Sequence, residues 1–244
     1  MALLEAENVE VRFGGVRAVA DVDLHVEAGT ITGLIGPNGA GKTTLFNVIC
    51  GLQAIDSGRV VLDGTDITKV KAHGRARLGI ARTFQRLEVF ASMTARENIL
   101  VAAEIRRQWS RDRSDPAVLV EEIIDLIGIG SVADRVAGAL PTGVGRLVEL
   151  GRALAAKPRV VLLDEPSSGL DEQESDAFAD LVVRLAGEGL AVLLVEHDVD
   201  LVMRVCSVIN VLDFGSVLAV GTPSDIQRDA GVRAAYLGEG DAVS

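Results

Sequence analysis

The stretch Gly36-Pro37-Asn38-Gly39-Ala40-Gly41-Lys42-Thr43 decides the fold of this chain, because it matches the pattern G-x-x-x-x-G-K-[ST] at every fixed position. Closely spaced glycines let backbone N–H groups turn toward an anion, and Lys42 adds a positive charge for phosphate groups. The Thr43 hydroxyl group can bind Mg²⁺. An apolar run at 31–35 precedes the stretch and a helical pattern follows it. This order of strand, loop and helix favours a loop that binds a nucleoside triphosphate over a simple glycine-rich turn.

The composition is that of an acidic globular chain. The formal net charge of its 244 residues is −11 and the pI is about 4.8, which argues against a protein that coats nucleic acid, so we expect no nucleic-acid partner. Apolar runs such as 190–195 end long before the roughly 18 residues of a membrane span. The first seven residues carry two acids and no basic side chain, so we expect no secretory signal and a cytoplasmic location. Cys50 and Cys206 lie in apolar helical patterns, and we expect both in the core.

Apolar periodicity divides the chain into three parts. The first part has strand patterns at 4–13, 22–26, 30–34, 59–62 and 78–86, of which the last runs out into a polar segment. From about residue 94 to residue 156 the period changes to about 3.6, which predicts helices at 94–107, at 116–127 and from about 143. After Pro158 the two patterns alternate, with strands expected at 160–163, 191–195, 208–212 and 217–220 and helices at 171–186 and 198–205.

These parts predict an α/β fold. Short, unbroken apolar strands indicate a mostly parallel sheet that is buried on both faces. We expect an antiparallel β subdomain at the N-terminus and a helical subdomain at 87–156, which is inserted into a catalytic core made of 1–86 and 157–244. The highly charged segment 106–116 is expected to be a solvated connection within the insertion.

Acidic side chains follow the apolar strand at 160–163. Ligands of open α/β sheets bind at the carboxyl ends of the strands, which is where Asp164 and Glu165 fall. Asp164 is then placed to hold Mg²⁺ through water, and Glu165 to polarise the water that attacks the γ-phosphate. His197 follows the strand at 191–195, so its neutral side chain can reach a γ-phosphate oxygen. The alternative, a strand end with solvated acids, is disfavoured by the phosphate loop.

Together these motifs resemble the nucleotide-binding subunit of ATP-binding-cassette (ABC) transporters, a family of P-loop NTPases. The resemblance covers nearly the whole chain and keeps the family's order and spacing of motifs, which are Gly36–Thr43, Gln85, Leu140–Val144, Leu162–Glu165, Ser168-Gly169-Leu170-Asp171 and His197. It implies a P-loop NTPase core in a single ABC ATPase domain over 1–244, with ATP and Mg²⁺ bound. It also implies an ATPase that works as a dimer, docked on integral-membrane permease subunits at the cytoplasmic face of the cell membrane.

The resemblance assigns roles to single residues as well. It implies that adenine stacks on Phe13 and that Asp171 communicates across the dimer. It implies three catalytic side chains, Glu165, His197 and Gln85, and makes Gln85 the lever between Mg²⁺ and the membrane partner. The implied metal ligands are Thr43, Gln85 and Asp164, and the implied nucleotide contacts besides Phe13 are Gly36, Pro37, Asn38, Gly39, Ala40, Gly41, Lys42, Thr43 and Thr44.

Within this family the chain is most similar to the ATPases of branched-chain amino-acid importers. The strings that carry this likeness are Arg12-Phe13-Gly14-Gly15, Ala81-Arg82-Thr83-Phe84-Gln85, Glu165-Pro166-Ser167-Ser168-Gly169-Leu170 and Ala235-Tyr236-Leu237-Gly238-Glu239. They imply a transporter that imports branched-chain or other hydrophobic amino acids. Two alternatives are a soluble cassette in translation or DNA repair, against which the acidic balance and the single loop argue, and a nucleotide-gated binding module with little turnover. The second ATPase subunit can be the same chain or a different one.

Two more features concern the partners. The counterpart of the family's Leu-Ser-Gly-Gly-Gln signature is Leu140-Pro141-Thr142-Gly143-Val144, in which two positions match, Leu140 and Gly143. Pro141 has neither a hydroxyl group nor an N–H, so we expect a weak clamp on the γ-phosphate of a partner subunit. Near Gln85 we expect an apolar groove for a permease helix, unless its side chains pack internally; they are Leu87, Val89, Phe90 and Met93.

Overall fold

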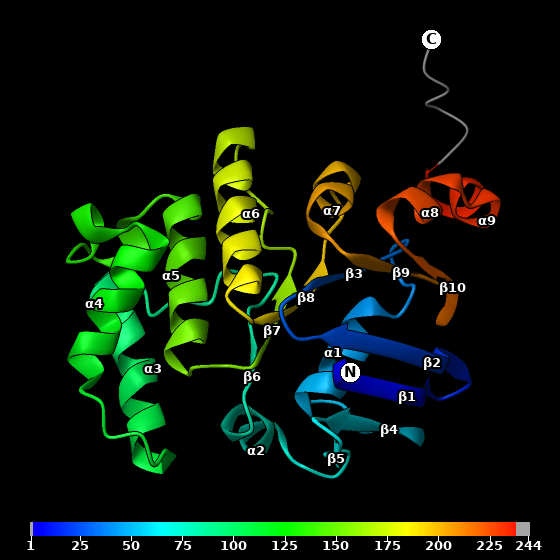
Figure 1. Cartoon of the computed structure of the whole chain (residues 1–244), viewed down its shortest axis with the longest axis horizontal. Helices are drawn as coiled ribbons and strands as arrows, with labels where there is room; N and C mark the ends of the chain where they lie inside the picture. Colours follow the sequence, from blue (N-terminus) through cyan, green and yellow to red (C-terminus); the bar gives the residue numbers. More distant parts are fainter. Residues whose placement is uncertain (1, 238–244) are drawn as a thin grey trace.

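The chain folds around a six-stranded sheet that is parallel except at one edge. The computed structural model describes residues 2–237 (Figure 1). Within them the strand order is β10-β9-β3-β8-β7-β6, and the antiparallel pair is β9 with β10. These strands are β3 (Ile31–Ile35), β6 (Ile80–Arg82), β7 (Val160–Asp164), β8 (Ala191–Val195), β9 (Val208–Asp213) and β10 (Ser216–Gly221).

A second, antiparallel sheet lies below the first. Its order is β2-β1-β4-β5. In Figure 1 it occupies the lower right of the molecule, and helix α1 lies between it and the six-stranded sheet. Its strands are β1 (Ala2–Phe13), β2 (Val16–Glu27), β4 (Ser57–Leu62) and β5 (Thr65–Asp66). The predicted combination of a mostly parallel sheet and an N-terminal antiparallel sheet is confirmed.

The six-stranded sheet is buried on both faces, as its continuous apolar strands predict. Every residue of β3, β7 and β8 is buried. One hydrophobic core joins one face of the sheet to the antiparallel sheet through apolar side chains of α1 such as Leu45 and Phe46. A second core joins the other face to the helices that follow β6. Both cores therefore meet at the same central strands.

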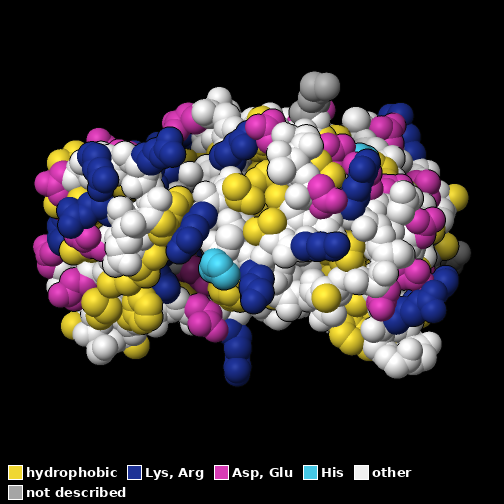
Figure 2. Space-filling model, turned by 90° about the horizontal axis from the view of Figure 1, so that it is seen from below, with side chains coloured by type: hydrophobic (Ala, Val, Ile, Leu, Met, Phe, Trp, Pro, Cys, Tyr) yellow, Lys and Arg dark blue, Asp and Glu magenta, His cyan; other side chains and the backbone are white. Residues whose placement is uncertain are grey.

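Helices form the rest of the molecule. At the left of Figure 1, α3 (Ala95–Trp109), α4 (Pro116–Ile127) and α5 (Thr142–Ala155) pack into one group. Seen from below, hydrophobic side chains gather at this end of the molecule beside Lys and Arg side chains (Figure 2). No helix within residues 2–237 has the length and apolar character that a membrane crossing needs. The other helices are α1 (Lys42–Cys50), α2 (Ala72–Arg77), α6 (Glu172–Gly187), α7 (Val199–Val205), α8 (Pro223–Arg228) and α9 (Ala230–Val232), with 3₁₀ turns at 130–132 and 137–139 and a π turn at 233–237.

Most predicted elements are present, but the strand predicted at 78–86 is wrong in its extent. Strand β6 has three residues, and α2 precedes it. The sequence missed α2 because its buried side chain is Arg75, not an apolar residue. The Arg75 guanidinium group donates to the carbonyl oxygens of Val48 and Ile49 at 2.6 and 2.7 Å and so caps the end of α1. The elements β5, α8 and α9 were not predicted either, and Gly238 and Glu239 of the C-terminal string lie outside the described residues.

The charged segment 106–116 is a largely exposed connection from α3 to α4, as expected, but hydrogen bonds also hold it. Helix α3 continues through Trp109, and Asp115 caps α4 by accepting the N–H of Ala117 at 2.9 Å. Asp112 accepts hydrogen bonds from Lys157 at 2.8 Å and from Arg106 at 2.9 Å. These donors hold the pKa of the Asp112 carboxyl group well below its usual range, with Lys157 as the largest cause. The segment is therefore held near the end of α5, because Lys157 lies two residues after that helix.

Both cysteines lie in the core, as predicted. Cys50 and Cys206 are free thiols with 9% and 7% of their surface exposed. Burial raises the pKa of Cys206 to about 12 and also raises the pKa of Cys50, so both stay protonated and unreactive at neutral pH.

Candidate nucleotide-binding site

Close backbone contacts require two of the glycines in the loop at 36–43. Gly36 has a φ of 147°, and a Cβ atom there would lie 2.0 Å from the carbonyl oxygen of Leu212. Gly41 has a φ of 103°, and a Cβ atom there would lie 2.3 Å from the carbonyl oxygen of Ala18. A Cβ atom on Gly39 would meet nothing within 4 Å, so this part of the loop faces open space. The loop is thus held by its neighbours on one side and accessible on the other.

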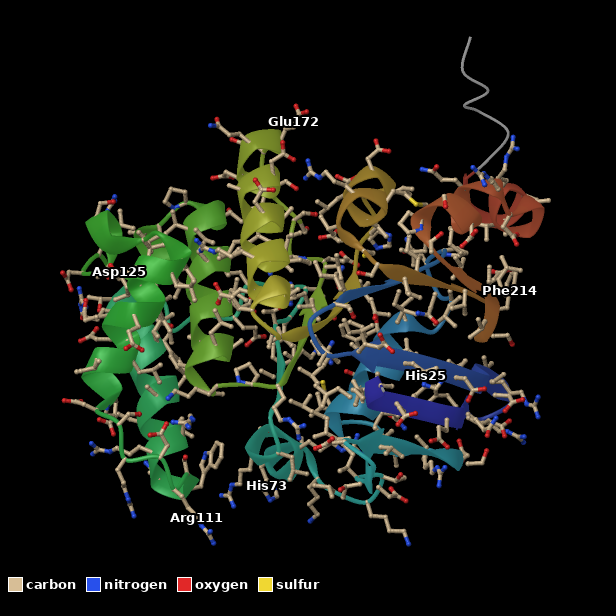
Figure 3. The ribbon with its side chains drawn as sticks, viewed as in Figure 1. His25, His73, Arg111, Asp125, Glu172 and Phe214 are labelled. Carbon is tan, nitrogen blue, oxygen red and sulfur yellow. The ribbon has the colours of Figure 1, made fainter. Side chains whose placement is uncertain are left out.

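The β9–β10 turn supports the loop from beside it. The N–H of Gly215 donates to the carbonyl oxygen of Ala40 at 3.1 Å, and the carbonyl oxygen of Gly215 accepts the N–H of Ala20 at 2.7 Å. The preceding residue, Phe214, has a φ of 43° and is 90% exposed, and it projects from the edge of the sheet (Figure 3). The sequence predicted this turn but not its contact with the loop.

Lys42 lies at the start of α1 with its side chain folded along the loop. Its Nζ atom donates to the carbonyl oxygens of Gly36 at 2.6 Å and of Pro37 at 3.0 Å. Burial lowers the pKa of Lys42, and the negative charges of Glu165 and Asp164 oppose that change. Two acceptors use two of the three ammonium protons, which leaves one for an anion above the loop. The side chain of the next residue, Thr43, is exposed at the same helix end.

Three predicted site residues meet at Glu165. The Glu165 carboxylate accepts a hydrogen bond from Gln85 Nε2 at 2.8 Å, and its other oxygen lies 2.8 Å from His197 Nε2. Glu165 has a φ of 48°, a conformation that costs a residue with a side chain on the order of 1–3 kcal/mol and that the surroundings must maintain. Its backbone N–H donates to the carbonyl oxygen of Val195 at 2.8 Å. The structure therefore brings together three loops that the sequence places 80 and 32 residues apart.

Asp164 forms a buried ion pair that the sequence did not predict. Arg82 Nη2 donates to its carboxylate at 2.7 Å, and both side chains are less than 10% exposed. Arg82 Nη1 also donates to Asn47 Oδ1 of α1 at 2.5 Å. The guanidinium group also lies over the rings of Phe46 and Phe84, at 5.5 and 4.9 Å from their centroids. Arg82 thus connects β6, β7 and helix α1.

A second buried arginine connects α5 to the segment around Gln85. Arg146 donates to the carbonyl oxygens of Phe84 at 2.8 Å and of Gln85 at 2.6 Å. Glu149 accepts the N–H of Phe84 at 3.1 Å and pairs with Arg146 at 3.1 Å. Burial raises the pKa of Glu149, although these donors oppose that change. These contacts connect the backbone of Gln85 to α5.

The signature counterpart lies at the start of α5. The helix begins at Thr142, and Pro141 precedes it without a capping side-chain hydrogen bond. Gly143 is buried against Glu174 of α6, because a Cβ atom there would lie 2.4 Å from Glu174 Oε1. Glu174 also forms a capping box with Asp171, whose carboxylate accepts the N–H of Glu174 at 2.8 Å. The helix end that would face a phosphate thus has a carboxylate next to it.

The structure does not bring all predicted residues to one point. Phe13 ends β1 opposite Val16, and half of its surface (52%) is exposed. Asp171 faces its own helix as an N-cap. Four buried charged residues around the site were missed, namely Arg82, Arg146, Glu149 and Glu196. Arg82 lies in the quoted string 81–85, and Glu196 is the residue before His197. A charged residue inside an apolar strand is the signal that could have revealed Arg82, because such a residue needs a buried partner.

Comparison with known proteins shows the family. Residues 19–168 match the profile of the ABC transporter family, and residues 216–242 match a profile described as branched-chain amino acid ATP-binding cassette transporter. The chain belongs to the ABC transporter ATP-binding family, and it is an ATPase subunit of a transporter that binds ATP and ADP.

Several relatives are similar over nearly their full length. The lipopolysaccharide export ATP-binding protein LptB of Haemophilus influenzae is 37% identical over 243 residues, which cover 98% of each chain. The branched-chain amino acid transport ATP-binding protein BraF of Pseudomonas aeruginosa is 38% identical over 250 residues, which cover 97% of this chain and 98% of BraF. Among solved structures, a nucleotide-free ATP-binding cassette of an ABC transporter is 31% identical, with a TM-score of 0.86 over 98% of this chain and 100% of that chain. An ATP-binding cassette in its ADP conformation is 32% identical, with a TM-score of 0.85 over the same shares of the two chains.

The buried pair of Arg82 and Asp164 leads to a prediction about stability. Replacing Arg82 by Met leaves a buried carboxylate without its partner, which should lower the free energy of unfolding by about 3–5 kcal/mol. Urea unfolding followed by circular dichroism measures this change. The matched control is Arg159→Met, which removes the pair with Asp63 at 2.9 Å, where the side chains are 46% and 66% exposed. The control should lose less than about 1 kcal/mol, and equal losses in the two variants would contradict the prediction.

Proposed function

We propose that the chain is the ATP-hydrolysing subunit of a transporter that imports branched-chain or other hydrophobic amino acids. The observation that carries this proposal is the match of residues 216–242 to the branched-chain amino acid profile. The similarity to BraF supports it over nearly the whole chain. Lipopolysaccharide export is the second candidate, because LptB is similar to almost the same degree. The C-terminal match favours the amino-acid importer.

The loop at 36–43 is proposed to hold the phosphates of ATP, together with Thr44. The support is its open side at Gly39, the third proton of Lys42, which no carbonyl oxygen of the loop accepts, and its place at the N-terminus of α1, which favours an anion. Thr43, Gln85 and Asp164 fit Mg²⁺, because the metal prefers oxygen ligands, and when bound it neutralises charge on the β- and γ-phosphates. Phe13 is proposed to stack on adenine, and its exposed ring is consistent with that role.

Glu165 is proposed to be the general base of hydrolysis. Its carboxylate takes a proton from the attacking water, while the water oxygen bonds to the γ-phosphorus and the bond from that phosphorus to the oxygen of ADP breaks. Gln85 orients the carboxylate by donating to one oxygen, and His197 contacts the other. His197 has 44% of its side chain exposed, so it is accessible to a γ-phosphate oxygen.

The role of Glu165 is tested by Glu165→Gln. The amide cannot take the proton, so kcat for ATP hydrolysis should fall by about 10²-fold or more, while the affinity for ATP stays within about twofold. Phosphate release measures the first quantity and calorimetry with ATP the second. The matched control is Glu172→Gln, an exposed acid at the start of α6 (Figure 3). Normal turnover by Glu165→Gln would mean that another group activates the water.

The membrane partner is proposed to dock at the cytoplasmic face of the membrane beside Gln85. Residues 87–156 act as a helical subdomain in this proposal, and 1–86 with 157–244 as the catalytic core. Leu87 and Phe90 are 37% and 44% exposed, and Val89 and Met93 are partly buried next to them. Arg152 of α5 stacks on Phe90 at 4.5 Å and donates to the carbonyl oxygen of Glu88. A permease helix seated here would therefore contact the segment that α5 holds.

Phe90→Asp tests both the docking surface and the transported solute. A charge on this surface should lower the amount of permease that copurifies with the tagged chain by at least about tenfold, without a change in ATP affinity. Cells that carry the variant should lose uptake of labelled leucine to the same extent. Val118→Asp, at an exposed apolar position of α4, is the matched control. Normal copurification would place the docking surface elsewhere, and normal leucine uptake with impaired copurification would exclude the amino-acid importer.

The second ATPase subunit is proposed to be a different chain that supplies a complete signature. The support is the counterpart at 140–144, where Pro141 has no N–H and Glu174 places a negative charge beside Gly143. This helix end would therefore bind the γ-phosphate of an ATP held by a partner subunit weakly. The ATP held by this chain's own loop does not depend on residues 140–144, so it is hydrolysed when the other subunit provides the signature.

The triple variant Pro141→Ser, Thr142→Gly and Val144→Gln tests this asymmetry. Each restored donor contributes about 1 kcal/mol, so the variant alone should turn over ATP at least about tenfold faster than the natural chain. The steady-state ATPase rate of both purified proteins gives the answer. If the natural chain alone turns over at about 1–10 s⁻¹ and the variant is no faster, the asymmetric dimer is wrong. A slow natural chain and a slow variant would instead support a binding module with little turnover.

A further inference from the structure

A buried carboxylate joins the two loops that carry Glu165 and His197. Glu196 is 2% exposed. Its Oε1 atom accepts the N–H of Ser167 at 2.8 Å, and its Oε2 atom accepts the N–H of His197 at 3.2 Å. Burial raises the pKa of this carboxyl group, and the hydrogen bonds from Ser167 and His197 oppose that change. The proposed hydrolysis makes no use of this acid, although it costs free energy to bury one.

The position of Glu196 explains what it can do. Ser167 comes two residues after Glu165, and His197 is the next residue after Glu196. The loops after β7 and β8 are otherwise connected by the N–H of Glu165 to the carbonyl oxygen of Val195 and by the contact of His197 with Glu165. Glu196 therefore gives the two loops a further connection, at Ser167, two residues beyond Glu165. The backbone of Glu165 is in the left-handed region, a conformation that needs support from its surroundings.

We propose that Glu196 is a positioning residue for ATP hydrolysis, which holds the loop of Glu165 against the loop of His197. It acts through the backbone N–H groups of Ser167 and His197 and has no hydrogen bond to the Glu165 side chain. The proposal rests on the proposed role of Glu165 as general base. It also connects the site to Asp171, because Ser167 begins the loop that ends at that residue.

The variant Glu196→Gln keeps the size of the side chain and changes its hydrogen bonding. A carboxylate accepts two N–H groups, whereas an amide offers one oxygen, and its NH₂ group would face the second N–H. One of the two hydrogen bonds is then lost, because the NH₂ group of the glutamine would face a backbone N–H group, and both groups are donors. Asp200→Asn is the matched control, since Asp200 is an exposed acid in the first turn of α7.

Two measurements test the proposal on the full chain, in the assembly that hydrolyses ATP fastest, alone or with its second subunit. In Glu196→Gln, hydrogen exchange of the Ser167 or His197 amide should become at least about tenfold faster, with exchange of the β7 and β8 amides unchanged. The kcat for ATP should fall about tenfold, with KM within about twofold. Asp200→Asn should match the natural chain in both measurements.

The remaining outcomes separate this proposal from the proposed function. If Glu196→Gln hydrolyses ATP normally while Glu165→Gln does not, Glu196 has no positioning role and the base assignment stands. If both variants hydrolyse ATP normally, the base assignment fails and the positioning role fails with it. If Glu196→Gln loses kcat but exchange also accelerates throughout β7 and β8, the residue serves general stability and the proposal is overturned.

Discussion

The parallel pairing of β3, β8 and β7 is the constraint on which the rest of the structure depends. Its register sets Leu34 beside Val195, and Val195 beside Asp164. Three strands from distant parts of the chain therefore end at the same level, and the loops that follow them emerge side by side. The loop at 36–43, the two acids Asp164 and Glu165 at the end of β7, and His197 after β8 share one edge for this reason. Alternate residues of the three strands pack into two different cores, so a slip by one residue would exchange the side chains of the two cores and disrupt the packing of both.

Buried charged side chains hold these loops in place through hydrogen bonds and ion pairs. Arg82, Arg146, Glu149 and Glu196 are buried, and each bonds to a carbonyl oxygen, an N–H or an opposite charge of a site loop. Burying such groups costs free energy, so they contribute more to the orientation of the groups they contact than to the net stability of the fold. Each of them allows few alternative hydrogen-bond geometries. Apolar packing could fill the same space, but it would not fix the positions of Gln85 and Ser167. The site thus depends on buried polar contacts in addition to the apolar core.

The same polar contacts connect the proposed nucleotide site to the surfaces that we propose for partners. Arg146 ties the Gln85 segment to α5, and α5 begins at the signature counterpart. Arg152 of the same helix contacts the segment at Glu88 and Phe90. Displacement of that segment by a partner would therefore be transmitted to α5 as a rigid element. In an ATP-driven transporter such a connection has an evident use, because binding energy at one site must move another.

The sequence by itself determined the class of fold, the glycine-rich loop at 36–43 and the strand ends that carry Asp164, Glu165 and His197. These depend on local patterns, namely apolar runs, glycine spacing and turn residues, that act within about ten residues of each other. Only the tertiary structure decided which side chains support the site. Arg82 and Asp164 are 82 residues apart, Arg146 and Gln85 61, and Ser167 and Glu196 29. The sheet register brings the members of each pair together, and each buried charge needs a partner. Local sequence patterns contain neither kind of information.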